Sequence, residues 1–230
     1  MSEQLILELA GPVAPAFDNF VEGANAELVA ALRDVAAGQG ADTGCLVWGV
    51  AGSGKTHLLR AVVGAARAVG VDAAFFDSPG SLAAADPELV GRRTLVAVDD
   101  VHAAGADAQA RLFTLFNVLR SGGGHLLVAS EPPPARLPLR EDLRTRLGWG
   151  TVYEVHPLTD AEKPAALVAW ARQRGFGLRD EVIAYLLGHG RRDMATLLAT
   201  LEALDRQSLA TRRPITVALL REWLQRGAGP

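Results

Sequence analysis

Short apolar runs alternate with longer segments of helical periodicity along the first two thirds of the chain. The apolar runs have the length of buried strands and are GCLVWG (44–49), AAFFD (73–77), TLVAVDD (94–100), HLLVAS (125–130) and TVYEV (151–155). Apolar residues at helical spacing lie between them in HLLRAVVGAARAVG (57–70) and in DAQARLFTLFNVLRSGG (107–123), which ends in a glycine stop. This alternation predicts an α/β fold in which helices cover a mostly parallel sheet.

The pattern changes after residue 158, where helical periodicity continues without further strands. Thr159 and Glu162 have the spacing of a capping box, which predicts a helix start. Pro214 precedes the last predicted helix, whose apolar face consists of Val217, Leu220, Trp223 and Leu224. We therefore predict three parts: an extended peptide over 1–11, an α/β core over 12–158 and a small helical domain over 159–230.

Composition narrows the class of protein. The chain has 230 residues, 49% of them hydrophobic, and a net charge of −3 with no basic block, so autonomous DNA binding is not expected. No apolar run approaches the roughly 20 residues that span a bilayer. The first residues lack a basic n-region followed by an apolar core, so we expect no secretory signal. Cys45 is the only cysteine, which excludes an internal disulfide and fits a reducing cytoplasm. We predict that its thiol is buried and inert.

A glycine-rich segment, GVAGSGKT (49–56), fits the phosphate-binding pattern G-x-x-x-x-G-K-[ST] between a predicted strand and a predicted helix. Lys55 would reach the β- and γ-phosphates of a nucleotide, and the hydroxyl of Thr56 would hold Mg²⁺. Lysine is rare here, since Lys55 and Lys163 are the only lysines among 23 basic residues. The predicted nucleotide-binding residues of the loop are Gly49, Gly52, Ser53, Gly54, Lys55 and Thr56. The alternative is a glycine-rich turn without a ligand.

Carboxylates and a hydroxyl follow two further apolar strands. Asp99 would hold Mg²⁺ through water, and Asp100 would orient the attacking water. Ser130, at the end of the next strand, would contact the γ-phosphate or the water as a sensor residue. The alternatives are a solvated turn after the first strand and a serine that merely caps the second. His57 and His102 lack metal-ligand spacing and are expected to pack.

Five segments together resemble the family of the bacterial replication initiator DnaA, a branch of the AAA+ ATPases. They occur in the family's order and are FDNFVEGAN (17–25), GSGKTHLL (52–59), LFTLFNVL (112–119) with Asn117, SEPP (130–133) and LRTRLGWG (143–150). The resemblance covers most of the chain and implies an AAA+ nucleotide-binding core followed by a helical lid. It also implies ATP or ADP with Mg²⁺ as cofactors, and ADP as the bound nucleotide of the active form.

Because the sequence stops after the predicted helical lid, we expect it to lack the helix-turn-helix DNA-binding domain that ends the initiators. The chain is similar to short members of the family that carry an ATPase module and a leading apolar peptide. That resemblance implies binding to the DNA polymerase sliding clamp and stimulation of ATP hydrolysis by DnaA in the cytoplasm, with a possible homo-oligomer and no membrane partner. A helicase-loader type of motor ATPase is the alternative function, and a nucleotide-gated assembly module is a third.

The family pattern assigns individual residues. Arg146 matches the arginine finger, which acts in trans on the nucleotide of a neighbouring subunit. The alternative for Arg146 is a surface salt bridge. The segment from Asp18 to Asn25 would lie near the adenine, mostly through backbone and packing contacts. Ala195 stands where the family carries its sensor 2 arginine, so Arg192, or Arg191 beside it, is the candidate replacement.

The leading peptide is similar to clamp-binding peptides of replication proteins. Gln4 would make hydrogen bonds, and Leu5, Leu7 and Leu9 share one side of an extended segment that can enter a groove. Glu8 departs from the proline or small residue expected there. The alternative is an N-terminal strand packed on the protein's own core.

Overall fold

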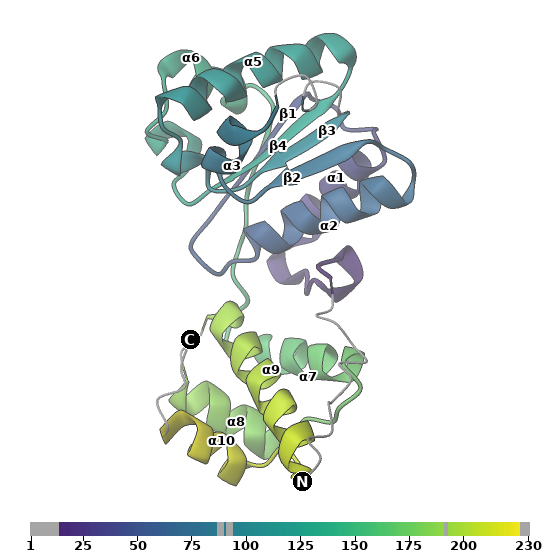
Figure 1. The fold of residues 1–230 in the computed structure, drawn as a ribbon, viewed down its shortest axis with the longest axis vertical. Helices are drawn as coiled ribbons and strands as arrows, with labels where there is room; N and C mark the ends of the chain where they lie inside the picture. Colours follow the sequence, from purple (N-terminus) through teal and green to yellow (C-terminus); the bar gives the residue numbers. More distant parts are fainter. Residues whose placement is uncertain (1–13, 87–89, 91–93, 191–192, 226–230) are drawn as a thin grey trace, which may run out of the picture. The chain divides into compact units, whose positions relative to one another are not determined.

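The structure is a computed structural model that describes residues 14–86, 90, 94–190 and 193–225. The chain divides between Pro157 and Leu158 into an α/β unit and a helical unit, which are described separately (Figure 1).

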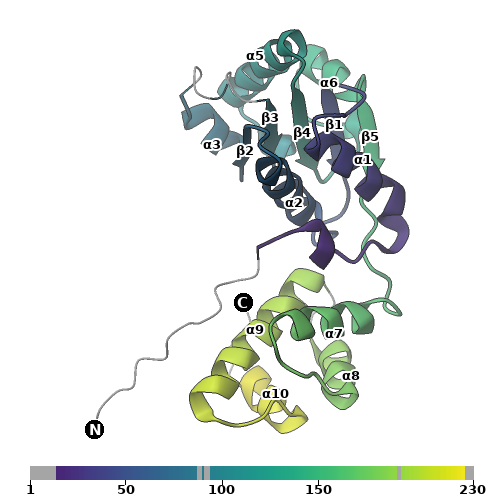
Figure 2. The ribbon, with the colours of Figure 1, turned by 90° about the vertical axis from the view of Figure 1, so that its right-hand side faces the viewer.

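A five-stranded parallel sheet lies at the centre of the α/β unit. Its strands are β1 (Gly44–Trp48), β2 (Ala73–Phe76), β3 (Leu95–Val98), β4 (His125–Ser130) and β5 (Thr151–Glu154). The order across the sheet is β2-β3-β4-β1-β5, which can be followed in Figure 2. Every predicted strand is present within two residues of its predicted ends, and the predicted α/β class is confirmed.

Helices cover both faces of this sheet (Figure 1). They are α1 (Ala26–Ala36), α2 (Lys55–Ala68), α3 (Pro79–Ala84), α5 (Ala106–Gly122) and α6 (Glu141–Gly148), with 3-10 turns η1 (Phe17–Asn19), η2 (Gly23–Asn25), η3 (Val101–Ala103) and η4 (Pro134–Arg136). The sequence pattern predicted α2 and α5 but not α1, α3 or α6. The predicted glycine stop of α5 is Gly123, whose φ of 71° lies in the left-handed region.

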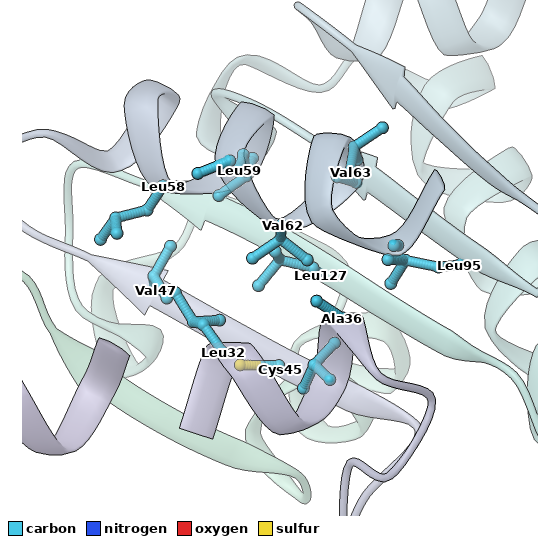
Figure 3. Close-up of a cluster of buried hydrophobic side chains, with 14 of the residues drawn as sticks. Leu32, Ala36, Cys45, Val47, Leu58, Leu59, Val62, Val63, Leu95 and Leu127 are labelled. Atoms are coloured by element: carbon cyan, nitrogen blue, oxygen red, sulfur yellow. The ribbon is translucent and has the colours of Figure 1, made fainter. Parts of the chain in front are cut away.

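Alternation along the strands divides the core into two layers. Residues such as Val47 and Leu127 pack with α1 and α2 on one face, as Figure 3 shows. Their neighbours Leu46 and Val128 pack on the opposite face with α5 and α6. Because each strand is buried on both faces, it appears in the sequence as a continuous apolar run rather than an alternating one.

The single cysteine belongs to the first of these layers. Cys45 is buried on β1, and burial, with a smaller contribution from the charge of Asp42, raises the pKa of its thiol to about 12. The thiol therefore remains protonated and inaccessible at physiological pH.

The helical unit has its own apolar core. Its helices are α7 (Lys163–Gln173), α8 (Asp180–His189), α9 (Met194–Thr211) and α10 (Val217–Gln225). The predicted face of α10 joins this core, which also contains Leu219. Thr159 donates from its backbone N–H and its hydroxyl to Glu162 Oε2, at 2.8 and 2.7 Å, but the helix begins only at Lys163. No helix within the described residues is long and apolar enough to cross a membrane.

Candidate nucleotide site and the opposite end of the sheet

The carboxyl ends of β1, β3 and β4 bring the predicted chemistry to one edge of the sheet. Trp48 is paired with Ser130 across β1 and β4, and the N–H of Gly49 donates to the carbonyl of Ser130 at 3.1 Å. Asp99 directly follows β3 on the other side of β4. Residues that are 81 and 82 positions apart in the chain thus become neighbours, which is how a parallel sheet builds a ligand site.

The predicted phosphate loop closes around Lys55. Lys55 Nζ donates to the carbonyl oxygens of Gly49 at 2.7 Å and Val50 at 2.9 Å, and the residue is only 6% exposed. Burial lowers the pKa of this ammonium group, while the nearby charge of Glu131 opposes that shift. The cation is therefore held inside the loop rather than extended into water.

Two glycines shape the loop in ways that a side chain would prevent. Gly54 has a φ of 105° and precedes the first turn of α2, and a Cβ there would lie 2.7 Å from the ring of Phe20. A Cβ at Gly49 would lie 2.6 Å from the carbonyl oxygen of Val155. The backbone N–H groups at the start of α2 can consequently line a concave loop, where helix N-termini favour phosphate.

Ser53 provides a test of whether the loop fits a phosphate. Its hydroxyl is buried and has no hydrogen-bond partner among the described residues. A buried hydroxyl without a partner is costly, and a phosphate oxygen would supply the missing acceptor. Together with the loop N–H groups and Lys55, the residues present fit the phosphates of a nucleotide.

The residues predicted to hold Mg²⁺ are in contact. Thr56 Oγ1 donates to Asp99 Oδ2 at 2.5 Å, and the N–H of Asp100 donates to Asp99 Oδ1 at 2.9 Å. Asp99 is 3% exposed, whereas Asp100 is exposed and has a φ of 50°. The described residues contain no group of three or more acidic, His or Cys side chains that could hold a metal alone. This sparse donor set fits Mg²⁺, which takes one or two protein ligands and completes its shell with phosphates and water.

Ser130 ends β4, as predicted, but its hydroxyl already donates a hydrogen bond within the chain. The residue is buried, and its hydroxyl donates to the carbonyl of Pro132 at 2.8 Å. The next residue, Glu131, was not predicted, although its charge acts on Lys55. The signal was available in SEPP (130–133), because an acid that follows β4 must lie beside the phosphate loop once β4 is known to pair with β1.

The side-chain amide of Asn25 binds the backbone of a distant residue, His156. Its Nδ2 donates to the carbonyl of His156 at 2.9 Å, and its Oδ1 accepts from the N–H of His156 at 2.8 Å. The amide thus ties the leading segment to the chain that leaves β5. Nearby, His57 Nε2 lies 3.0 Å from the carbonyl oxygen of Ala16, and burial lowers the pKa of its ring.

Arg146 is placed away from this loop, at the other end of β1. The carbonyl of Arg146 lies against Gly44, which begins β1, whereas the phosphate loop begins at Gly49. The five residue steps from Gly44 to Gly49 span about 16 Å of extended strand. Arg146 Nη1 donates to Asn117 Oδ1 at 2.6 Å, and the guanidinium stacks 4.2 Å from the ring centroid of Phe113.

The remaining predicted residues include some that the structure does not describe. Gln4, Leu5, Leu7 and Leu9 lie outside the described residues, as do Arg191 and Arg192. Ala195 is in the first turn of α9, which begins at Met194 and is capped by Asp193 through the N–H of Thr196.

Comparisons with known proteins agree with this architecture. Residues 14–73 match the profile of the bacterial DnaA ATPase domain, and residues 160–224 match that of the Hda lid domain. Domain III of the Thermotoga maritima replication initiation protein DnaA superposes with a TM-score of 0.80 at 20% identity, covering 96% of this chain and 100% of that one. The chain is a DnaA-like AAA+ protein.

Other solved structures share the fold at greater distance. DnaA from Aquifex aeolicus, bound to AMPPCP, has a TM-score of 0.70 at 22% identity over 83% of this chain, which spans only 65% of that protein. The RuvB Holliday junction branch migration motor of Thermotoga maritima has a TM-score of 0.65 at 16% identity, covering 92% of this chain and 71% of that one. This DnaA-like protein thus combines a segment that matches the bacterial DnaA ATPase domain with a lid that matches the Hda lid domain.

Proposed function

We propose that this protein regulates the initiation of chromosome replication by binding a nucleotide in its own loop and stimulating ATP hydrolysis by DnaA. The observation that carries the proposal is the separation of Arg146 from the phosphate loop along β1. An arginine at that distance is too far away to contact the protein's own phosphates, so we assign it to the nucleotide of a neighbouring subunit. The match of the lid to the Hda lid domain supports the same direction.

The protein's own nucleotide, ATP or ADP, would be held by residues that the fold already brings together. The N–H groups of the loop and Lys55 would hold its phosphates, and Thr56 with Asp99 would hold Mg²⁺. A bound Mg²⁺ ion supplies neutralisation of phosphate charge. Asp100 is exposed at this edge, in position to accept a hydrogen bond from water. Because sensor 2 is Ala195 in this chain, we expect slow intrinsic hydrolysis.

The guanidinium of Arg146 keeps its charge and most of its N–H donors available for a partner. Its guanidinium stays charged at all physiological pH values, and only one of its five N–H donors is used within the described residues, by Asn117. Stacking on Phe113 limits the rotamers of the side chain, so less freedom is lost on docking. The free donors can spread positive charge over the γ-phosphate oxygens of ATP bound to DnaA.

Clamp binding completes the proposal. The peptide over residues 1–11 would dock on the DNA polymerase sliding clamp, with Gln4 making hydrogen bonds and Leu5, Leu7 and Leu9 entering an apolar groove. Clamp binding would bring the regulator to sites of DNA synthesis. The competing function, a loader or motor ATPase, is favoured by the intact set of Lys55, Asp99 and Asp100, and rapid ATP turnover without any partner would identify it.

The decisive experiment measures ATP hydrolysis by DnaA in the presence of loaded clamp and this protein. Arg146→Ala is expected to lower the stimulated rate by about 10³–10⁵-fold, the usual worth of an arginine finger. Arg144→Ala is the matched control, since Arg144 lies on the same helix and makes no ion pair among the described residues. Normal stimulation by Arg146→Ala would overturn the trans-acting role, and loss of its own nucleotide would show that Arg146 acts in cis.

A second experiment tests the leading peptide. Deletion of residues 1–9 is expected to abolish clamp binding in surface plasmon resonance while leaving the melting temperature nearly unchanged. If the three leucines instead pack on this protein's own core, each should contribute about 2–5 kcal/mol, and the deletion should unfold the protein. Survival of clamp binding in the truncated protein would also contradict the proposal.

A further inference from the structure

An exposed tryptophan stands beside Arg146. Trp149 is 68% exposed at the end of α6, and its backbone N–H donates to the carbonyl of Arg146 at 3.3 Å. The other large apolar side chains that are exposed in the described residues are aliphatic: Val50, Val69, Val118 and Leu209. A tryptophan left in water forgoes more burial than any of these, and tryptophan is enriched among the residues that dominate binding at protein interfaces.

The backbone fixes the place from which this side chain projects. Leu143 and Leu147 anchor α6 in the core, so the helix cannot rotate to bury Trp149. The following residue, Gly150, lies so close to Gly44 of β1 that any Cβ would collide with its carbonyl oxygen. Trp149 is therefore held between a packed helix and a packed strand, which gives a preorganised anchor.

The charge next to Trp149 indicates what would cover it. The guanidinium of Arg146 donates to the Asn117 amide and has no carboxylate partner among the described residues. An exposed aromatic side chain next to an uncompensated guanidinium group fits a partner surface that carries phosphates next to an apolar rim. A phosphate loop occupied by ATP has that chemistry.

We propose that Trp149 is the apolar anchor with which this protein docks on the ATP-loaded ATPase domain of DnaA, beside the phosphate that Arg146 contacts. This inference rests on the proposed function. It divides the work between neighbouring residues: Trp149 supplies affinity, and Arg146 supplies stabilisation of the charge that develops during hydrolysis. The two side chains should consequently affect different kinetic parameters.

The test measures DnaA ATP hydrolysis with loaded clamp over a range of regulator concentrations. Trp149→Ala should raise the half-saturating concentration at least tenfold and leave the maximal rate within about twofold. Trp149→Phe should restore most of the affinity, because an aromatic ring still fills the partner's surface. Val69→Ala, an equally exposed apolar residue at the end of α2, is the matched control and should change nothing.

The outcomes separate this inference from the function on which it rests. If Arg146→Ala abolishes stimulation but Trp149→Ala leaves the half-saturating concentration unchanged, the anchor is wrong and the function stands. If neither variant has an effect, the proposed function fails. Should Trp149→Ala only lower the melting temperature, or only dissociate oligomers of this protein in sedimentation velocity, Trp149 packs within the fold or against a second copy, and the inference is overturned.

Discussion

The two ends of β1 carry opposite kinds of surface. At its carboxyl end, Lys55 and Asp99 are almost fully buried, and each has hydrogen bonds to neighbouring loop residues. At its amino end, Trp149 is 68% exposed, and the guanidinium of Arg146 has no carboxylate partner in the described structure. At the carboxyl end, the polar groups find most of their hydrogen-bond partners within the chain. At the amino end, the chain leaves guanidinium donors and an indole ring uncovered.

This difference shows how one fold can separate binding from action on a partner. A phosphate loop must be preorganised, because its N–H groups have to converge on one anion, and burial strengthens each electrostatic contact there. An arginine that acts in trans needs the reverse, since a guanidinium satisfied by internal carboxylates would have nothing left to offer. Asn117 and Phe113 hold Arg146 without neutralising it, which meets that requirement.

The largest effect at the carboxyl end is expected from Lys55→Ala. Removing the cation deletes the charge that faces the phosphates, so we expect nucleotide affinity to fall by at least a hundredfold in isothermal titration calorimetry. Lys163→Ala serves as the control, because it removes the only other lysine, which pairs with Asp160 in the helical unit. Tight ATP or ADP binding by Lys55→Ala would contradict the assignment of the loop.

The strands and the phosphate loop could be predicted from the sequence because each depends on a local pattern of residues. A strand buried on two faces must be apolar throughout, and a loop that cradles phosphate must carry glycine where a Cβ would collide, as at Gly49 and Gly54. The order β2-β3-β4-β1-β5 then places Asp99 and Ser130 beside the loop. These relations could be inferred from apolar runs and from the resemblance to DnaA.

Other features depend on contacts between distant parts of the chain, which periodicity does not reveal. Both ends of the Asn25 amide bind the backbone of His156, 131 residues away. The exposure of Trp149 could not be read from LRTRLGWG, because an aromatic residue after an amphipathic helix is as easily buried as exposed. The helix α1 was missed because no motif marks it, although Leu28, Val29 and Leu32 have helical spacing and are buried.

The smallest predicted effect compares two serines of the nucleotide edge. Ser53 is buried with a hydroxyl that has no partner in the described residues, so Ser53→Ala should leave the free energy of unfolding unchanged or raise it by up to about 1 kcal/mol. Ser130→Ala is the matched control, because the Ser130 hydroxyl donates to the carbonyl of Pro132, and its loss should cost about 1–3 kcal/mol. Urea denaturation of the nucleotide-free protein measures both.

Nucleotide should stabilise Ser53→Ala less than the unmodified protein, because the variant lacks the hydroxyl that would donate to a phosphate oxygen. Equal destabilisation by the two substitutions would mean that Ser53 has a partner within the fold, and that the carboxyl end of β1 is as self-contained without nucleotide as with it.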